Sequence, residues 1–389
     1  MDIRRPTPFA AAMAEQEDQR GGDGGPINLW VADPGFETDP RIVEAFDYAV
    51  RRGCTHYFPA AGFDEFALPK AVAKYYLDGF GANLDPLGEV SATHGAQEAL
   101  SLSIQACTRP GDEIIVPEPT YSVLIEKLEI FGVKPVFVSL MEEDSWRLDP
   151  GAIASAVTDK TRMIFVCNPN NPTGTVCSRE DMDALAAILR ANRGVSMLLD
   201  ECYARILYDG GAHRTLLGER ELMDQLFVVG SFSKAYAMTG WRLGYVVAGK
   251  KNTERIKRLS FEYNGGVSYA VQYAGAVALG ECSDFVERMV GELTRRRRAM
   301  LAGLSELRDV PCVVPQAGFE VFPDFSAYSR NSKALVAALE KEARVKTMPG
   351  VEYGPSGEGH IRLVFCSEDS ERISEGISRI GRCLPPRRS

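Results

Sequence analysis

Residues 231–245 read Ser-Phe-Ser-Lys-Ala-Tyr-Ala-Met-Thr-Gly-Trp-Arg-Leu-Gly-Tyr, and the rest of the chain is organised around them. Apolar segments that read as strands, 226–230 and 243–248, stand on either side. Lys234 therefore follows a predicted buried strand, where an ammonium without a partner would cost free energy. The lysine makes chemical sense if its amine condenses with an aldehyde, because that reaction removes the charge.

The residues near Lys234 favour an anion as ligand. Ser231 and Ser233 offer hydroxyl groups, and Arg242 offers a guanidinium suited to a phosphate. An aldehyde that carries a phosphate is pyridoxal 5'-phosphate (PLP). A lone lysine at the end of a strand is most often a solvated loop residue, but the whole cluster favours a cofactor site.

The pattern Ser-Phe-Ser-Lys, with an arginine after seven further residues, closely resembles the lysine signature of fold-type I, PLP-dependent aminotransferases of class I/II, in their aspartate/aromatic branch. The resemblance extends over about 27–382 in the family's order. It implies an α/β fold whose large domain has a mostly parallel mixed sheet between helices, with a smaller α+β domain. It also implies an enzyme that uses PLP to move an amino group between an L-amino acid and a 2-oxo acid.

Length and composition agree with a large globular enzyme. The chain has 389 residues, with 45% hydrophobic and 25% charged residues, so more than one domain is expected. The net charge of −9 argues against a nucleic-acid surface. The basic run 295–298 lies in a helical pattern, and we interpret it as a solvated helix face.

Cysteine usage and hydropathy bear on the compartment. The nine cysteines show no paired metal-ligand spacing, which predicts a reduced, cytoplasmic protein without a metal site. The first residues lack the apolar core of a signal peptide, and no apolar run approaches the length of a membrane span. We therefore expect no membrane association.

From about residue 87 the sequence alternates between predicted strands and helices, which is typical of an α/β layer fold. The predicted strands are 89–93, 113–117, 134–139, 162–167, 196–199, 226–230 and 243–248, and later 319–322 and 361–365. The main predicted helices are 40–52, 64–77, 96–107, 121–131, 179–192, 254–260, 283–306, 332–342 and 369–382. We expect an N-terminal arm (1–26), a large PLP-binding domain (50–280) and a small domain built from 27–49 and 281–389.

A predicted phosphate site lies where the strand 89–93 meets a helix. Backbone amides at a helix N-terminus bind anions, and a glycine lets the anion approach closely. The resemblance places the family's phosphate cup at Gly95, Ala96 and Gln97. His94 is unusual for the family, and two interpretations remain open: contact with the cofactor, or a packed polar residue.

Further cofactor contacts follow from the resemblance. Tyr121 matches an aromatic residue that stacks on the pyridine ring, although a core tyrosine is the simpler interpretation. Asn171, in the segment Asn-Pro-Asn-Asn-Pro-Thr-Gly at 168–174, matches an asparagine that donates to the phenolic oxygen and helps to hold the substrate carboxylate. Tyr57 matches a tyrosine that reaches the phosphate in the neighbouring subunit, which implies a homodimer with shared active sites.

The strand 196–199 ends in Asp200-Glu201-Cys202-Tyr203. A buried carboxylate needs a partner, and a pyridinium nitrogen is a suitable one. We assign this role to Asp200. Tyr203 is expected to hydrogen-bond the phenolic oxygen, and Glu201 is expected to point outward. Lys234, Asp200 and Tyr203 are thus the predicted catalytic residues, with Lys234 also acting as general base on the α-proton.

The substrate is expected to bind through an arginine near the C-terminus. Arg362 stands in an otherwise apolar strand and needs an anionic partner, and a planar carboxylate matches its geometry. The resemblance assigns it to the substrate α-carboxylate, with a structural salt bridge as the alternative. The resemblance also places Ala32 beside the substrate, at a position where the family usually has glycine.

Two other departures from the family leave a second function open. Glu320 replaces an aromatic or apolar residue and either faces solvent or helps to recognise a cationic substrate. The segment 263–268 is unusually rich in glycine. These features motivate an alternative, a PLP-dependent lyase or cyclase that catalyses elimination, replacement or annulation on an amino acid. A regulator that only binds PLP is disfavoured, because about 26 residues are too few for a DNA-binding module.

Overall fold

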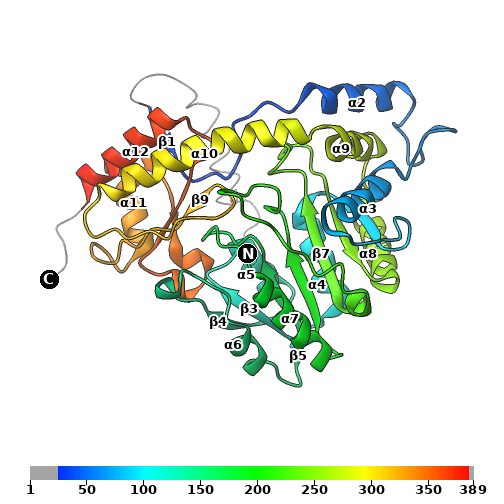
Figure 1. Ribbon diagram of the computed structural model, residues 1–389, viewed down its shortest axis with the longest axis horizontal. Coiled ribbons are helices and arrows are strands. Elements are labelled where there is room, and N and C mark those ends of the chain that lie inside the picture. The colour runs from blue at the N-terminus through cyan, green and yellow to red at the C-terminus, as the bar shows by residue number, and fades with distance from the viewer. Residues whose placement is uncertain (1–24, 385–389) are drawn as a thin grey trace.

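The computed structural model describes residues 25–384, and its centre is a seven-stranded sheet with the order β2-β8-β7-β6-β5-β3-β4 (Figure 1). The strands are β2 (Val90–Thr93), β3 (Glu113–Glu118), β4 (Lys134–Ser139), β5 (Thr161–Cys167), β6 (Ser196–Asp200), β7 (Leu226–Ser231) and β8 (Gly244–Ala248). Strands β4, β3, β5, β6 and β7 run parallel to one another, and β8 is antiparallel to both of its neighbours. The predicted α/β fold with a mostly parallel mixed sheet is confirmed.

Both faces of the inner strands of this sheet are buried, because apolar residues occupy consecutive positions along them. Ile115, Ile164 and Leu199 belong to one core, and Ile114 and Phe165 belong to the other. Successive side chains of a strand point to opposite faces, so a continuous apolar strand needs helices on both sides. This requirement explains the long apolar strands of the sequence.

The helices that flank or extend this sheet match most of the predicted ranges. They are α2 (Pro40–Arg51), α3 (Ala67–Phe80), α4 (Gly95–Cys107), α5 (Ser122–Ile130), α6 (Pro150–Ser155), α7 (Arg179–Ala191), α8 (Lys250–Asn264) and α9 (Tyr269–Glu281). Helices α6 and α9 were not predicted. The hydrophobic residues of α9 are spread around the helix, so they do not form the one-sided stripe by which an amphipathic helix is recognised.

A second group of elements lies beside the large sheet. It holds a three-stranded antiparallel sheet of β9 (Glu320–Val321), β12 (Ile361–Val364) and β11 (Met348–Pro349), and a parallel pair of β1 (Ile27–Asn28) and β10 (Val345–Lys346). Its helices are α11 (Ser332–Glu342), α12 (Ser370–Cys383) and the long α10 (Ser283–Ser305). Helix α10 runs from α9 to α12 and so spans both groups (Figure 1).

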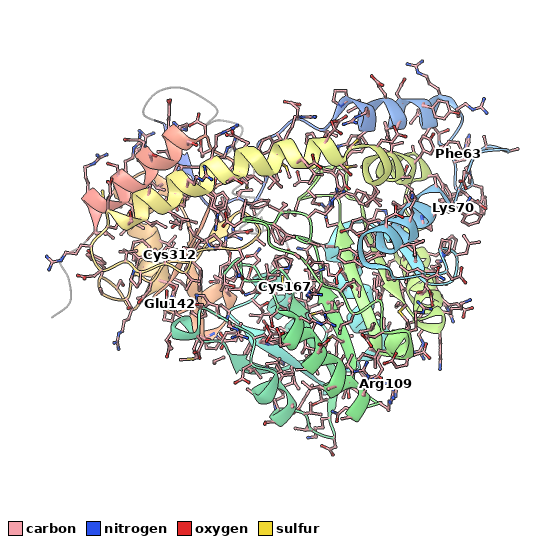
Figure 2. All side chains as sticks on the ribbon, viewed as in Figure 1. Phe63, Lys70, Arg109, Glu142, Cys167 and Cys312 are labelled. Atoms are coloured by element: carbon pink, nitrogen blue, oxygen red, sulfur yellow. The ribbon has the colours of Figure 1, made fainter. Side chains whose placement is uncertain are left out.

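The predicted division into domains stays a prediction. Residues 1–24 of the predicted arm and 385–389 of the predicted small domain lie outside the described residues. Figure 2 shows that the side chains of Phe63 and Lys70 lie at one end of the molecule, far from Cys312 and Glu142 beside the small sheet. Between residues 25 and 384, no helix combines the length and the apolar character that a membrane crossing requires.

The prediction of a solvated basic run at 295–298 is wrong for two of its arginines. Arg296 and Arg297 are buried, with 9% and 6% of their surface exposed. Arg296 donates to the Cys366 carbonyl over 2.7 Å and lies over the ring of Phe36. Arg297 pairs with Asp209 at 2.9 Å. Buried guanidinium groups are tolerated when such partners surround them, and the partners are distant in sequence.

Candidate active site

The candidate site lies where the carboxyl ends of β6 and β7 meet the small sheet. In parallel strands these ends share one edge, which is where open α/β sheets bind ligands. Asp200 ends β6, and Lys234 follows three residues after β7. The Lys234 amine crosses to the N-terminal segment and donates to the Ala32 carbonyl over 2.7 Å, and it lies 5.6 Å from the ring centre of Phe319. Lys234 and Ala32, 202 residues apart in sequence, are therefore neighbours.

Asp200 is a buried carboxylate with few partners. It is 4% exposed, and Oδ1 accepts a hydrogen bond from the Cys202 backbone N–H over 3.1 Å. Burial raises the pKa of the Asp200 carboxyl above its usual range, while the nearby Lys234 ammonium opposes this shift. An added cationic N–H group would stabilise the ionised form. A pyridinium nitrogen would be such a group, and this role of Asp200 stays a prediction.

The backbone at the start of α4 leaves room for an anionic group to approach closely. Gly95 has a φ of +75°, and a Cβ atom there would lie 2.8 Å from a guanidinium nitrogen of Arg242. A Cβ on Gly244 would meet the Gly95 backbone at 2.7 Å, so strand β8 also packs tightly against this turn. The guanidinium of Arg242 therefore lies beside the N-terminal amides of α4, where an anion binds well.

The other predicted cofactor residues occupy the same region. Ser233 is buried, and the Ser231 hydroxyl accepts its backbone N–H over 3.2 Å. The Gln97 side chain donates to the Tyr121 hydroxyl over 2.5 Å, so the side chains of two predicted ligands are in contact. Both the backbone N–H and the ring of His94 contact the Glu98 carboxylate at the start of α4.

Asn171 and Arg362 carry buried polar atoms without partners. Asn171 is 3% exposed, and its Oδ1 has no hydrogen-bond partner among the described residues. The Arg362 guanidinium donates through Nη2 to the Trp30 carbonyl over 2.5 Å, while its buried Nε is unpaired within residues 25–384. Unpaired buried polar atoms are costly unless a ligand pairs with them. An arginine with a free Nε edge can bind a carboxylate in bidentate fashion.

The environment of Glu201 differs from the prediction, and that of Glu320 excludes one of its two interpretations. Glu201 does not point outward, because it is 4% exposed and accepts a hydrogen bond from Tyr76 over 3.0 Å. Glu320 does not face solvent either, since its exposed fraction is 0%. The Tyr203 hydroxyl donates to Glu320 Oε1 over 2.5 Å. Sequence analysis missed this pair, because a glutamate on a two-residue strand gives no local signal of burial.

Tyr57 lies outside the site within a single chain. Its side chain is 83% exposed, and its ring comes near Gly265, where an added Cβ would lie 3.6 Å from it. Its neighbour Phe58 is also highly exposed. Exposed aromatic residues side by side are common at protein–protein interfaces.

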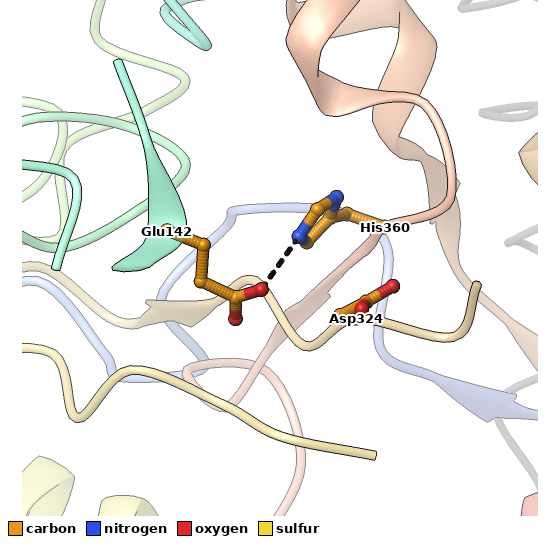
Figure 3. Close-up of side chains that lie close together, drawn as sticks. All are labelled: Glu142, Asp324 and His360. Carbon is orange, nitrogen blue, oxygen red and sulfur yellow. Dashed lines mark hydrogen bonds and ion pairs between the residues drawn. The ribbon is translucent and has the colours of Figure 1, made fainter. Parts of the chain in front are cut away.

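Two other features lie near the site without belonging to it. A cavity of about 330 Å³ is lined by Cys167 at the end of β5 and by Asn170 and Thr175 nearby, and its lining includes neither Lys234 nor Asp200. Glu142, Asp324 and His360 place possible metal-ligand atoms within 4.8 Å of one another (Figure 3). His360 contacts Glu142 at 3.2 Å, so this cluster forms a polar contact between the segment after β4 and the residue before β12.

The whole described chain resembles known proteins. Residues 25–380 match the family model described as "Aminotransferase class I and II". The chain is 33% identical to an aspartate aminotransferase of Pyrococcus horikoshii over 92% of this chain and 90% of that protein. It is 31% identical to aromatic-amino-acid aminotransferase 2 of Thermococcus litoralis, over 94% of each chain.

Solved structures agree with the sequence matches. The aspartate aminotransferase of Thermus thermophilus, solved with maleate, superimposes with a TM-score of 0.88 at 30% identity, over 98% of this chain and 97% of that chain. At this identity and coverage, the common fold extends over both sheets.

The burial of Asp200 predicts a stabilising substitution. Below the usual pKa of an aspartate the group is protonated in both the folded and unfolded states, so burial has no electrostatic cost. As the pH rises through the raised pKa of folded Asp200, stability is lost. Without PLP, Asp200→Asn should therefore unfold at a higher temperature than the wild type at pH 7.5, with a smaller difference at pH 4.

Thermal unfolding of the PLP-free protein, followed by circular dichroism at both pH values, measures this difference. Asp183→Asn on the exposed face of α7 is the matched control and should change the unfolding temperature little at either pH. An Asp200→Asn variant that is less stable than the wild type at pH 7.5 would contradict the prediction.

Proposed function

The chain belongs to the aminotransferases of class I and II, enzymes that move an amino group between an amino acid and a 2-oxo acid, and we propose that it does so with PLP held at Lys234. One observation carries the proposal. The structure buries an incompletely paired carboxylate on Asp200 and a partly paired guanidinium on Arg362, and the Lys234 amine donates to the same N-terminal segment, 30–32, as Arg362 does. A pyridinium nitrogen of PLP would pair with Asp200, and the carboxylate of an amino acid would pair with Arg362.

The residues present fit PLP. Arg242, Ser231, Ser233 and the first amides of α4 would hold its phosphate, with Gly95 leaving room for it. The Asp200 carboxylate would pair with the ring nitrogen, and Tyr121 would lie against the ring. When bound, PLP supplies an aldehyde that condenses with a primary amine, with loss of water, and a ring that accepts the electron pair left when the α-proton departs.

The chain's own groups then orient the substrate and move the proton. Arg362 binds the α-carboxylate through its free Nε edge, and Asn171 adds a second polar contact. Once the Lys234 amine is free, its Nζ removes the α-proton, holds it and returns it at the position required for amino-group transfer. Asp200 keeps a proton on the ring nitrogen, which strengthens electron withdrawal.

The alternative of a lyase or cyclase gains no support from the relatives named above. Their names specify aspartate and aromatic amino acids as substrates of those proteins. We propose an L-amino acid and a 2-oxo acid as the substrates of this chain. The expected cytoplasmic location stays a prediction, which cell fractionation would test.

The half-reaction tests the proposed function directly. The PLP-loaded protein is mixed with single amino acids in the absence of any oxo acid. Aminotransfer should release one equivalent of 2-oxo acid per site and then stop. Continuous release of an oxo acid with ammonia would instead favour the lyase alternative.

Lys234→Ala is the critical variant in this assay. It should lower the rate at least about 10⁴-fold, because it removes both the attachment group and the general base. Lys250→Ala replaces an exposed lysine paired with Asp85 and should behave as the wild type. Retained turnover in Lys234→Ala would refute the role of this lysine.

The carboxylate role of Arg362 predicts a selective loss. Arg362→Lys keeps the charge but not the planar pair of donors, so kcat/KM for the amino donor should fall about 10- to 100-fold. Steady-state kinetics measure this ratio. Arg190→Lys changes an arginine on α7 that pairs with Glu219 and Glu221, and it should leave kcat/KM unchanged. An unchanged ratio in Arg362→Lys would contradict the assignment.

We further propose a homodimer in which Tyr57 of each subunit reaches the phosphate site of the other. The exposure of Tyr57 within the single chain supports this proposal. Light scattering should give about 85 kDa, twice the 42.6 kDa of one chain. Tyr57→Phe should weaken PLP binding roughly tenfold, whereas Tyr48→Phe should not. A monomeric, PLP-loaded protein would rule the arrangement out.

A further inference from the structure

Glu320 and Tyr203 form a buried pair at the centre of the candidate site. The Tyr203 hydroxyl donates to Glu320 Oε1, and the Phe319 backbone N–H donates to Oε2 over 2.9 Å. Both carboxylate oxygens therefore have donors, and the exposed fraction of Glu320 is 0%. Because an ionised carboxylate can only accept hydrogen bonds, this arrangement suits the ionised form.

The register of the small sheet places Glu320 on the face that carries Arg362. Val364 pairs with Glu320, and Leu363 pairs with Val321, in the antiparallel pair of β12 and β9. Side chains alternate between the two faces of a strand, so Glu320 and Arg362 point to the same face. This face is directed toward Tyr203, and Glu320 also interacts electrostatically with the Arg362 guanidinium.

The local backbone is shaped to hold the pair. Gly318 has a φ of +73°, and a Cβ atom there would lie 2.8 Å from Glu320 Oε2 and 3.5 Å from the Tyr203 ring. The Gly318 carbonyl accepts a hydrogen bond from Tyr208 over 2.5 Å, which fastens this turn to the loop after β6. Any larger residue at 318 would displace the carboxylate.

A tyrosine hydroxyl has one proton with which to donate a hydrogen bond, and here Tyr203 donates it to Glu320. The Tyr203 oxygen can then offer only lone pairs to another group. We propose that Glu320 is a positioning residue that keeps Tyr203 from donating to the phenolic oxygen of PLP, so that Asn171 is the side-chain donor to that oxygen. This inference rests on the proposed function, and it specifies where one proton lies in the site.

The direction in which Glu320 would change the pH of cofactor deprotonation follows from the negative charge of the phenolic oxygen. A donor at the phenolic oxygen would stabilise its negative charge and weaken its hold on the proton that it shares with the attached lysine nitrogen. Without that donor, the proton stays in place to higher pH. Glu320 thereby helps to keep the cofactor protonated, and therefore electrophilic, at neutral pH.

Other ionisable groups surround the pair and stay the same in the experiment below. Those that interact with Glu320 are Cys167, Tyr208, Tyr353, Arg362 and Cys366. Asp200 and Lys234 lie on the cofactor side. Burial raises the pKa of the Tyr203 hydroxyl, and the Glu320 carboxylate raises it further, so Tyr203 keeps its proton.

A pH titration of the visible absorption of the PLP-loaded protein tests the proposal. Glu320→Gln turns the acceptor into an amide whose NH₂ can donate to the Tyr203 oxygen, which frees the Tyr203 proton for the phenolic oxygen. The spectral transition should therefore move to lower pH by roughly one unit. Tyr203→Phe should not raise the transition pH above that of the wild type, and the double variant should match Tyr203→Phe.

Two outcomes would overturn the proposal about Glu320, and a third would overturn the proposed function. A higher transition pH in Tyr203→Phe would show that Tyr203 donates to the cofactor in the wild type, which overturns the proposal even if Glu320→Gln does not fold. An unshifted Glu320→Gln would also overturn it. Glu352→Gln, whose carboxylate pairs with Lys333, should titrate as the wild type. If wild-type protein and PLP give no Lys234-dependent visible band, the proposed function itself fails.

Discussion

The Asp200 carboxylate, buried at the end of β6 with a backbone N–H as its hydrogen-bond donor, is the constraint on which the rest of the site depends. Folding places this charge at the carboxyl edge of a sheet whose two faces are already covered by helices. In the PLP-free protein its burial opposes stability, and this cost is offset only when a cationic partner arrives. A site that needs its ligand in this way is preorganised for the charge that the chemistry requires.

The second requirement is that two sheets meet at one place. The large sheet supplies Asp200 and Lys234, and the small sheet supplies Arg362 and Glu320. They are joined by direct contacts between the loop after β6 and the segment at β9, among them the Tyr203–Glu320 and Tyr208–Gly318 hydrogen bonds. Helix α10, which contacts both α9 and α12, spans the same junction. The substrate carboxylate and the cofactor ring are thus proposed to bind to different sheets, so the relative position of the two sheets determines their alignment.

Much of this could be predicted from the sequence, because strands and helices follow local patterns. The large-sheet strands lie within a residue or two of the predicted ranges, since apolar runs and turn residues mark their ends. Helix α9 was missed because its apolar residues are not confined to one side. The buried partners of Arg296, Glu201 and Glu320 were missed because they come from segments distant in sequence. Burial of a charged residue depends on those partners, and no local pattern reports it.

The sequence by itself determined the chemistry: a lysine beside anion ligands after a strand, a carboxylate at the end of another strand, and an arginine in an apolar one. Residue type and spacing carry this information, because each group needs a specific kind of partner. Only the tertiary structure decided how these groups face one another. It brought Lys234 to Ala32 and paired Tyr203 with Glu320. The direction of a single hydroxyl proton depends on such long-range packing, and packing is a property of the folded chain.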